Sequence, residues 1–157
     1  MESKQSQTVP WKQVQKGILK KQVTAMTEEG NIQASTRIKL LLVDDEEGFV
    51  NVIANRMSKR GIDATKALSG TDALKALRGQ DFDVAVVDLK MQEMDGIELL
   101  RILKKMVPEM PVIMLTGHGS ERAEEEGMEY GAFDYLTKPC ELDELMQKIR
   151  EALPRGR

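Results

Sequence analysis

From residue 38 onward, apolar residues along this chain follow two alternating patterns. Short runs that are apolar at nearly every position alternate with longer stretches in which apolar residues recur every three or four positions. The first pattern is typical of strands buried on both faces, and the second is typical of amphipathic helices. The predicted strands are Ile38–Val43, Asp63–Ala67, Val84–Val87, Val112–Leu115 and Phe133–Leu136. The predicted helices are Phe49–Arg60, Gly70–Leu77, Gly96–Met106, Ser120–Tyr130 and Glu141–Leu153.

This succession of strand–helix units favours an α/β fold in which a parallel sheet carries helices on both faces. The expected architecture is a flavodoxin-like (βα)5 three-layer sandwich with strand order 2-1-3-4-5. In that order the winding direction reverses between strands 1 and 3, so a cleft opens at their carboxyl ends. Functional side chains are therefore expected at these strand ends.

Composition is that of one ordinary domain with a short extension. The chain has 157 residues, 41% of them hydrophobic, and a formal net charge of -3. Because the charge balance is mildly acidic, direct nucleic-acid binding is not expected. The single cysteine, Cys140, excludes an internal disulfide and fits a reducing compartment. No apolar run is long enough for a membrane span and no secretory signal is present, so we expect a cytoplasmic protein without membrane insertion.

The predicted domain comprises residues 37–157, and residues 1–36 form an N-terminal extension. Apolar residues at helical spacing predict an amphipathic helix over residues 11–26, and residues 27–36 have the composition of a linker. Several interpretations of the extension are open: a dimerisation or docking helix, a mildly basic arm, a disordered tail or, with Met26 as the natural start, an upstream leader. A homodimer is accordingly one of the assemblies left open.

Acidic residues follow two neighbouring strands of the predicted sheet. Asp44 and Asp45 come directly after the first strand, and Asp88 comes after the third. Three carboxylates in one cleft repel one another unless one is protonated or a cation lies among them. Oxygen ligands suit a hard cation, so we expect Mg²⁺ there. The alternative interpretation of Asp44 and Asp45 is that they only cap the following helix.

A hydroxyl and an amine follow the remaining strands of this edge. Thr116 ends the fourth strand, and Lys138 comes just after the fifth. An aspartate can attack a phosphoryl group and form an acyl phosphate. Asp45 and Asp88 can hold Mg²⁺ against the phosphoryl oxygens, which Lys138 and the Thr116 hydroxyl can also contact. The strand ends therefore predict a phosphoryl-transfer site.

Five short segments carry a resemblance to a known family. They are VDDE at 43–46, VD at 87–88 followed by MDG at 94–96, LTG at 115–117 and DYLTKP at 134–139. Together they resemble the receiver domain of two-component response regulators, over about residues 37–153, and in particular the stand-alone receivers of the chemotaxis type.

The resemblance implies how the acceptor and the metal are held. Asp88 would be the phosphoacceptor. Asp44, Asp45 and Asp88, together with the backbone carbonyl of Lys90, would bind Mg²⁺. Lys138 would pair with the phosphoryl group, and its bond to Pro139 would be cis.

The resemblance also implies which residues switch conformation and which control the lifetime of the acyl phosphate. Thr116 would be the switch hydroxyl, and the Tyr135 phenol would move with it from an exposed to a more buried position. Lys90 and His118 would flank the path of the hydrolytic water and tune the lifetime of the acyl phosphate. One departure is visible: Gln92 stands where family members usually have proline. This change is expected to loosen the loop without affecting the chemistry.

The expected function is a phosphoryl-accepting signalling switch and not an enzyme with turnover. Its donor would be a sensor histidine kinase or a histidine phosphotransfer protein. Because the chain ends directly after the fifth helix, a stand-alone receiver that acts on an unknown downstream protein by contact is expected. The alternative is an aspartate-nucleophile phosphatase of the haloacid-dehalogenase type, which needs an acid where Lys90 stands. A flavodoxin is disfavoured because the acids after the first strand would repel its phosphate.

Overall fold

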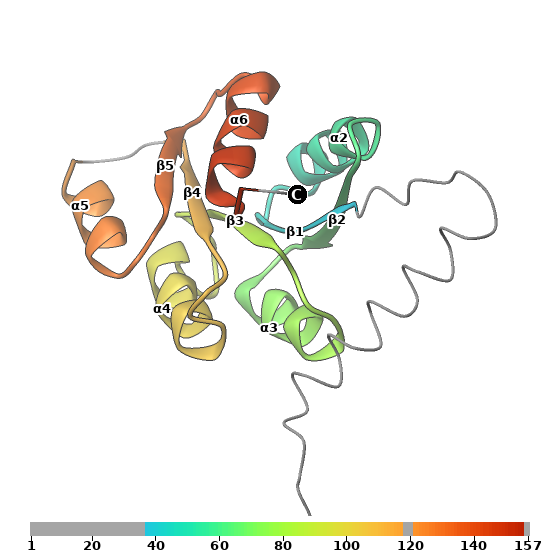
Figure 1. Cartoon of the computed structure of the whole chain (residues 1–157). Helices are drawn as coiled ribbons and strands as arrows, with labels where there is room; N and C mark the ends of the chain where they lie inside the picture. The colour runs from blue at the N-terminus through green and yellow to red at the C-terminus, as the bar shows by residue number, and fades with distance from the viewer. Residues whose placement is uncertain (1–36, 118–120, 156–157) are drawn as a thin grey trace, which may run out of the picture. The chain divides into compact units, whose positions relative to one another are not determined.

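The computed structural model describes residues 37–117 and 121–155 of the chain. Its strands are β1 Ile38–Val43, β2 Ile62–Ala67, β3 Val84–Asp88, β4 Val112–Thr116 and β5 Asp134–Thr137. Its helices are α2 Glu47–Ser58, α3 Gly70–Gly79, α4 Gly96–Met106, α5 Glu121–Glu129 and α6 Leu142–Ala152. Each strand is followed by a helix, as the alternating hydrophobic pattern predicts (Figure 1).

The strands form one sheet in the order β2-β1-β3-β4-β5, with every neighbouring pair parallel. This order confirms the predicted flavodoxin-like α/β fold. Val43 at the end of β1 lies beside both Ala67 of β2 and Val87 of β3. Asp88, the last residue of β3, lies beside Leu115 of β4. The carboxyl ends of the strands therefore share one edge of the sheet, where the candidate residues were expected.

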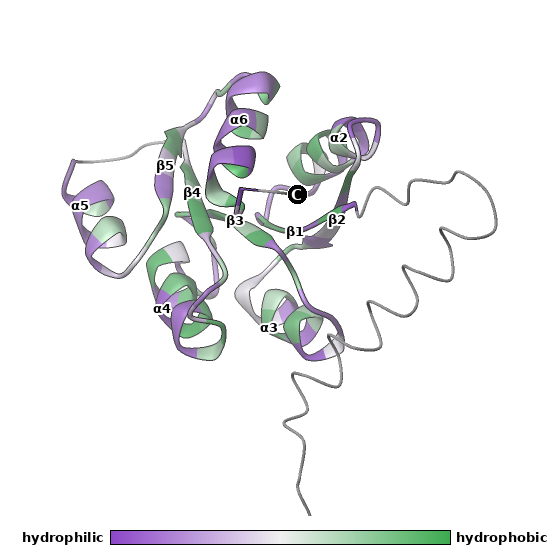
Figure 2. Ribbon diagram, viewed as in Figure 1, coloured by the Kyte–Doolittle hydropathy of each residue, from purple (hydrophilic) through white to green (hydrophobic). Residues whose placement is uncertain are grey.

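Helices cover both faces of the sheet: α2 and α6 lie on one face, and α3, α4 and α5 lie on the other (Figure 1). The strands are largely hydrophobic, and the helices carry hydrophilic residues away from the sheet (Figure 2). β3 and β4 are buried along their whole length, as strands covered on both faces must be.

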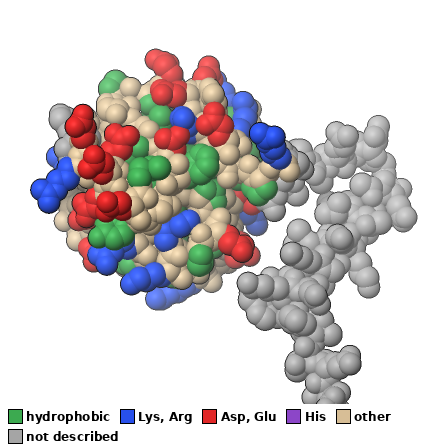
Figure 3. All heavy atoms as spheres, turned by 60° about the vertical axis from the view of Figure 1, so that its left-hand side comes forward, with side chains coloured by type: hydrophobic (Ala, Val, Ile, Leu, Met, Phe, Trp, Pro, Cys, Tyr) green, Lys and Arg blue, Asp and Glu red, His purple; other side chains and the backbone are tan. Residues whose placement is uncertain are grey.

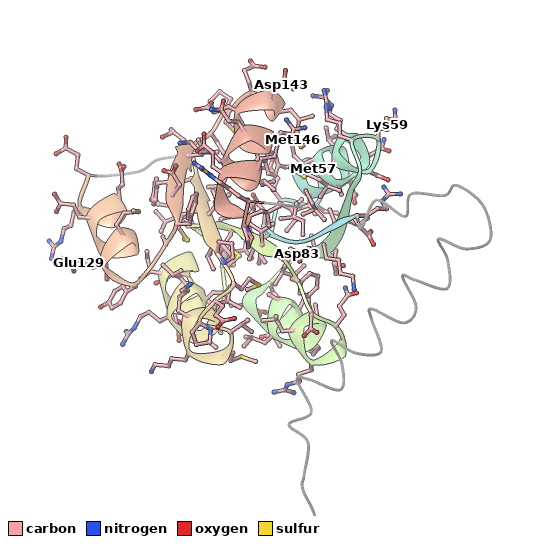
Figure 4. The ribbon with its side chains drawn as sticks, in the orientation of Figure 1. Met57, Lys59, Asp83, Glu129, Asp143 and Met146 are labelled. Carbon is pink, nitrogen blue, oxygen red and sulfur yellow. The ribbon has the colours of Figure 1, made fainter. Side chains whose placement is uncertain are left out.

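Met57 of α2 and Met146 of α6 show how the first face is closed. Both are buried in the cluster that also contains Leu40 and Leu42 of β1. Their side chains lie between the two helices (Figure 4). At the amino end of β3, the Asp83 carboxylate accepts a hydrogen bond of 2.9 Å from the Lys39 backbone N–H. Packing and edge hydrogen bonds thus hold the central strands that position the site.

Several predicted boundaries were displaced. α2 begins at Glu47, two residues early, because an acidic first turn is favourable at a helix N-terminus, and it ends at Ser58. β2 begins at the buried Ile62, which pairs with Ile38. β5 excludes Phe133, whose ring is 40% exposed. α3 continues to Gly79, two residues beyond its predicted end at Leu77.

The predictions for residues 1–36, including the helix over 11–26, lie outside the described residues. His118 and Ser120 also lie outside them. In the described part of the chain, no helix is both long and apolar enough to cross a membrane.

Candidate functional site

Three carboxylates converge at the carboxyl edge of the sheet. Asp44 follows β1 directly, Asp45 comes next, and Asp88 ends β3. One oxygen from each of the three lies within 4.8 Å of the others. Asp44 and Asp88 are buried, with 1% and 7% of their surfaces exposed. This set of oxygen donors fits a hard divalent cation such as Mg²⁺.

Asp44 contributes more than a helix cap. Its Oδ1 accepts a hydrogen bond of 2.9 Å from the Glu46 N–H at the start of α2, and its Oδ2 contacts the Lys138 ammonium. Glu46 occupies the N-cap position of α2 and makes no side-chain capping bond. The capping interpretation therefore accounts for the contact that Oδ1 of Asp44 makes. It does not account for Oδ2, which contacts the Lys138 ammonium.

Lys138 brings a positive charge into the carboxylate cluster. Its Nζ contacts Asp44 and lies 3.7 Å from Oδ1 of Asp88. Its backbone N–H donates a hydrogen bond of 2.6 Å to the Thr116 carbonyl, which ties the segment after β5 to the end of β4. The Lys138–Pro139 peptide bond is cis, as expected.

The pKa of Asp88 is raised to about 6. Burial is the main cause, and the charge of Asp44 and, more weakly, that of Asp45 add to it. The Lys138 ammonium and a backbone hydrogen bond from Lys90 oppose this rise. The charged form of Asp88 therefore needs additional positive charge, which a divalent cation would supply.

Thr116 ends β4, and Tyr135 lies in the neighbouring strand β5. Thr116 is buried, with 1% of its surface exposed. Burial raises the pKa of the Tyr135 phenol, and the neighbouring Thr116 hydroxyl lowers it. The phenol oxygen is buried, and no described group meets the full geometry of a hydrogen bond with it. The expected exposed starting position of this phenol is therefore wrong for this structure, because the ring already packs against the core beside Gly127.

Gly96 fixes the loop between Asp88 and α4. A Cβ atom there would lie 2.2 Å from the Asp88 carbonyl oxygen and 2.8 Å from Cα of Leu89. The Gly96 N–H donates a hydrogen bond of 2.8 Å to the Leu89 carbonyl. Asp95 caps α4 by accepting a hydrogen bond of 2.8 Å from the Glu98 N–H. Only glycine permits this close approach of α4 to the end of β3.

Gln92, which stands where family members usually have proline, contacts a candidate metal ligand through its backbone. Its backbone N–H donates a long hydrogen bond of 3.3 Å to Oδ2 of Asp45. Proline has no N–H and could not make this contact. The departure at position 92 therefore adds an orienting contact to one of the candidate metal ligands.

The structure brings together Asp44, Asp45, Asp88 and Lys138, and it places Thr116 beside the last of these through the backbone. The Lys90 side chain is exposed. Two contacts at this site were not predicted: the hydrogen bond from the Gln92 N–H to Asp45, and the Phe49 ring, whose centroid lies 4.3 Å from the Lys138 ammonium. Neither follows from residue spacing, because both depend on loop geometry.

Comparison with known proteins agrees with this geometry. Residues 40–150 match the family model of the response regulator receiver domain. The chain is 40% identical over 114 residues to the transcriptional regulatory protein GlrR of Escherichia coli, covering 73% of this chain and 26% of that protein. It is 42% identical over 118 residues to the heme response regulator HssR of Staphylococcus aureus, covering 75% of this chain and 52% of that protein. The chain thus spans about a quarter to a half of these relatives.

Solved structures show the same fold. The receiver domain of the Francisella response regulator 1452 matches with a TM-score of 0.70 and 37% identity, covering 76% of this chain and 99% of that one. The chemotaxis protein CheY4 of Vibrio cholerae matches with a TM-score of 0.72 and 27% identity, covering 75% of this chain and all of that one (100%).

The fold is α/β, and the carboxyl edge of its parallel sheet carries acids, a hydroxyl and a lysine. This combination defines a phosphoryl-accepting switch domain. The chain belongs to the family of response regulator receiver domains of two-component systems, as its motifs predicted.

Proposed function

We propose that Asp88 accepts the phosphoryl group and that Mg²⁺ is required for the transfer. The observation that supports this proposal is the convergence of three carboxylates within 4.8 Å around the buried end of β3. Asp44, Asp45 and Asp88, with the backbone carbonyl of Lys90, would hold the ion. Bound there, Mg²⁺ would offset the negative charge of the cluster and of the phosphoryl oxygens.

Each residue of the site would have a separate role in the phosphoryl transfer. An Asp88 carboxylate oxygen attacks phosphorus, the bond from phosphorus to the donor breaks, and the donor departs with the bonding electron pair. Lys138, 3.7 Å from Asp88, balances charge on the phosphoryl oxygens. The Thr116 hydroxyl donates a hydrogen bond to one of them. Lys90 and His118 would tune the later hydrolysis.

The donor we propose is a sensor histidine kinase or a histidine phosphotransfer protein, because a phosphorylated imidazole supplies a phosphoryl group without an added cosubstrate. The phosphorylated protein would act as a switch and not as an enzyme with turnover. A phosphatase of the haloacid-dehalogenase type would need an acid at position 90, and this chain has lysine there.

The output surface we propose is formed by α5, β5 and α6. Tyr135 connects this surface to the site, because a Cβ atom at Gly127 of α5 would lie 3.7 Å from its Cε2. When Thr116 shifts toward the phosphoryl group, Tyr135 repacks and α5 adjusts. Acidic and hydrophobic side chains lie side by side on this part of the molecule (Figure 3), and a partner protein that reads the phosphorylated form would contact it.

Labelling with acetyl phosphate tests the acceptor and the metal together. The wild-type protein should gain one phosphoryl group when Mg²⁺ is present, and acetate should leave. Asp88→Asn should gain none, whereas Asp81→Asn, which changes an exposed aspartate in a loop, should be labelled like wild type. Label retained by Asp88→Asn, or labelling unaffected by excess chelator, would refute the proposal.

A further inference from the structure

The Lys138 ammonium has a third neighbour besides Asp44 and Asp88. It lies over the ring of Phe49, 4.3 Å from the ring centroid, within the range in which an aromatic face attracts a cation. The side chain of Lys138 is 17% exposed, so solvent screens this contact only in part. The ammonium is thus held by two carboxylates and one ring.

The ring and the lysine come from distant parts of the chain. Phe49 is the third residue of α2, which follows β1, whereas Lys138 follows β5. β3 and β4 lie between β1 and β5 in the sheet. Lys138 therefore extends across the sheet edge on a flexible side chain, and a contact at the far end restricts its rotamers.

Phe49 itself is partly buried and packs against the core cluster on its face of the sheet. The next residue, Val50, is fully buried, and its N–H donates a hydrogen bond of 3.1 Å to the Glu46 carbonyl. Glu46 is in turn bonded through its N–H to Asp44. Backbone hydrogen bonds at the start of α2 thus keep the segment that carries Phe49 close to the carboxylate that Lys138 contacts.

The ring differs from Asp44 in one chemical respect. Asp44 must serve both Lys138 and any divalent cation in the cluster, because both need its oxygens. The aromatic face attracts the ammonium but is a poor ligand for Mg²⁺, which prefers oxygen. Phe49 can therefore keep its contact with Lys138 while Asp44 turns to the metal.

We propose that Phe49 is a positioning residue for phosphoryl transfer: its ring holds the Lys138 ammonium beside Asp88 when Asp44 binds the metal. This inference rests on the proposed role of Asp88 as phosphoacceptor. It adds a residue that touches neither the phosphoryl group nor the metal and acts through Lys138. The ring lowers the cost of ordering Lys138 in the transition state.

Fluorination of the Phe49 ring distinguishes its attraction for the Lys138 ammonium from the packing of the ring. A trifluorinated phenylalanine at position 49 nearly keeps the size of the ring and weakens its attraction for a cation. The full-length protein carrying it should accept phosphoryl from acetyl phosphate about two- to fivefold more slowly, the factor that corresponds to a partly exposed cation–π contact. The same replacement at Phe133, which precedes β5 at its opposite end, should leave the rate unchanged.

The Lys138→Met background shows whether Phe49 acts through the lysine. Labelling should be slower in this variant than in wild type, and fluorination at position 49 should slow it no further. An equal loss in both backgrounds would mean that the ring acts through packing and would overturn the proposal. A rate unchanged by fluorination in the wild-type background would also overturn it.

A spectroscopic measurement does not depend on phosphorylation. The ε-methylene protons of Lys138 should resonate upfield in the wild-type protein because of the ring current of Phe49, and they should move downfield in Phe49→Leu. Unchanged shifts would refute the contact even if Asp88 accepts phosphoryl. If the shifts move but wild type is not labelled at Asp88, the contact stands and the proposed function fails.

Discussion

α4 and α5 cover the same face of the sheet, but they are anchored very differently. α4 buries Gly96, Leu99, Leu100 and Leu103, whereas Gly127 is the one buried residue of α5, a helix whose residues are all described. α5 carries five glutamates among its nine residues and no basic residue in its last turn. Like charges spaced four residues apart and an acidic C-terminus both weaken a helix. α4 is therefore the fixed support of the site, and α5 is the element that a small free energy can move.

The two buried glycines show the same contrast at the atomic level. A Cβ atom at Gly96 would lie 2.2 Å from the backbone oxygen of Asp88, which cannot give way. A Cβ atom at Gly127 would meet the side chains of Ile97, Tyr135 and Met114 at 3.5, 3.7 and 3.9 Å, which are ordinary contacts. The same substitution should therefore have opposite effects in the two helices.

The largest effect is expected from Gly96→Ala. We predict that it lowers the free energy of unfolding by about 3 kcal/mol, because the new methyl group must displace either α4 or the end of β3. Urea denaturation would measure this loss. A change of less than about 0.5 kcal/mol, the range of an ordinary surface substitution, would contradict the role of Gly96 as a close-contact position.

Removing the buried charge of Asp88 should have the next largest effect on stability. The raised pKa of Asp88, about 6, means that the unfolded chain loses this proton at lower pH than the folded protein does. The contribution of Asp88 to stability should therefore fall as pH rises from about 4 to about 6, and the full cost should remain above that range. In metal-free buffer at pH 7.5, Asp88→Asn should stabilise the protein on the order of 1 to 3 kcal/mol.

Most of this gain should be lost near pH 3.5, where Asp88 is mostly protonated in both states. Glu125→Gln, which removes an acid from the exposed face of α5, should change stability by less than about 0.5 kcal/mol. It should also show no such pH dependence. A pH-independent gain in Asp88→Asn would mean that packing, and not the buried charge, causes it.

Gly127→Ala should produce a smaller change in the opposite direction to Gly96→Ala. Alanine fits the available space and favours the helix, so we predict a gain of about 0.5 to 1 kcal/mol in stability. Hydrogen exchange of the α5 amides should slow accordingly. A loss of stability would show that α5 is packed more tightly than the distances at Gly127 indicate.

The smallest effect is expected in the loop that leads into α4. Gln92→Pro removes one N–H, which donates a hydrogen bond of 3.3 Å to Asp45. We predict that Mg²⁺ binds about threefold more weakly, because a long and exposed hydrogen bond contributes little. Gln92→Ala keeps the N–H and serves as the matched control in calorimetric titration. Equal affinity in Gln92→Pro and wild type would show that this hydrogen bond does not contribute to Mg²⁺ binding.

Hydrophobic patterning predicted the alternating strands and helices, and the order that is common for five parallel strands then predicted the edge where Asp44, Asp45 and Asp88 meet. Packing between distant segments was not predictable in this way. The buried position of the Tyr135 phenol depends on the space beside Gly127, and the contact between Phe49 and Lys138 depends on how far a lysine reaches across the sheet edge. Boundaries moved where capping and turn geometry, rather than apolar spacing, end an element, as at Ser58 and Phe133.

The central claim is that a phosphoryl group on Asp88 is read at α5 through Thr116 and Tyr135. Hydrogen exchange of the beryllium fluoride complex, which imitates the phosphoryl group, tests it directly. The wild-type protein should show changed protection across Glu121–Glu129 while α4 stays unchanged. Thr116→Ala should bind beryllium fluoride and lose the α5 change. A response in Thr116→Ala equal to that of wild type, or a response confined to α4, would contradict the claim.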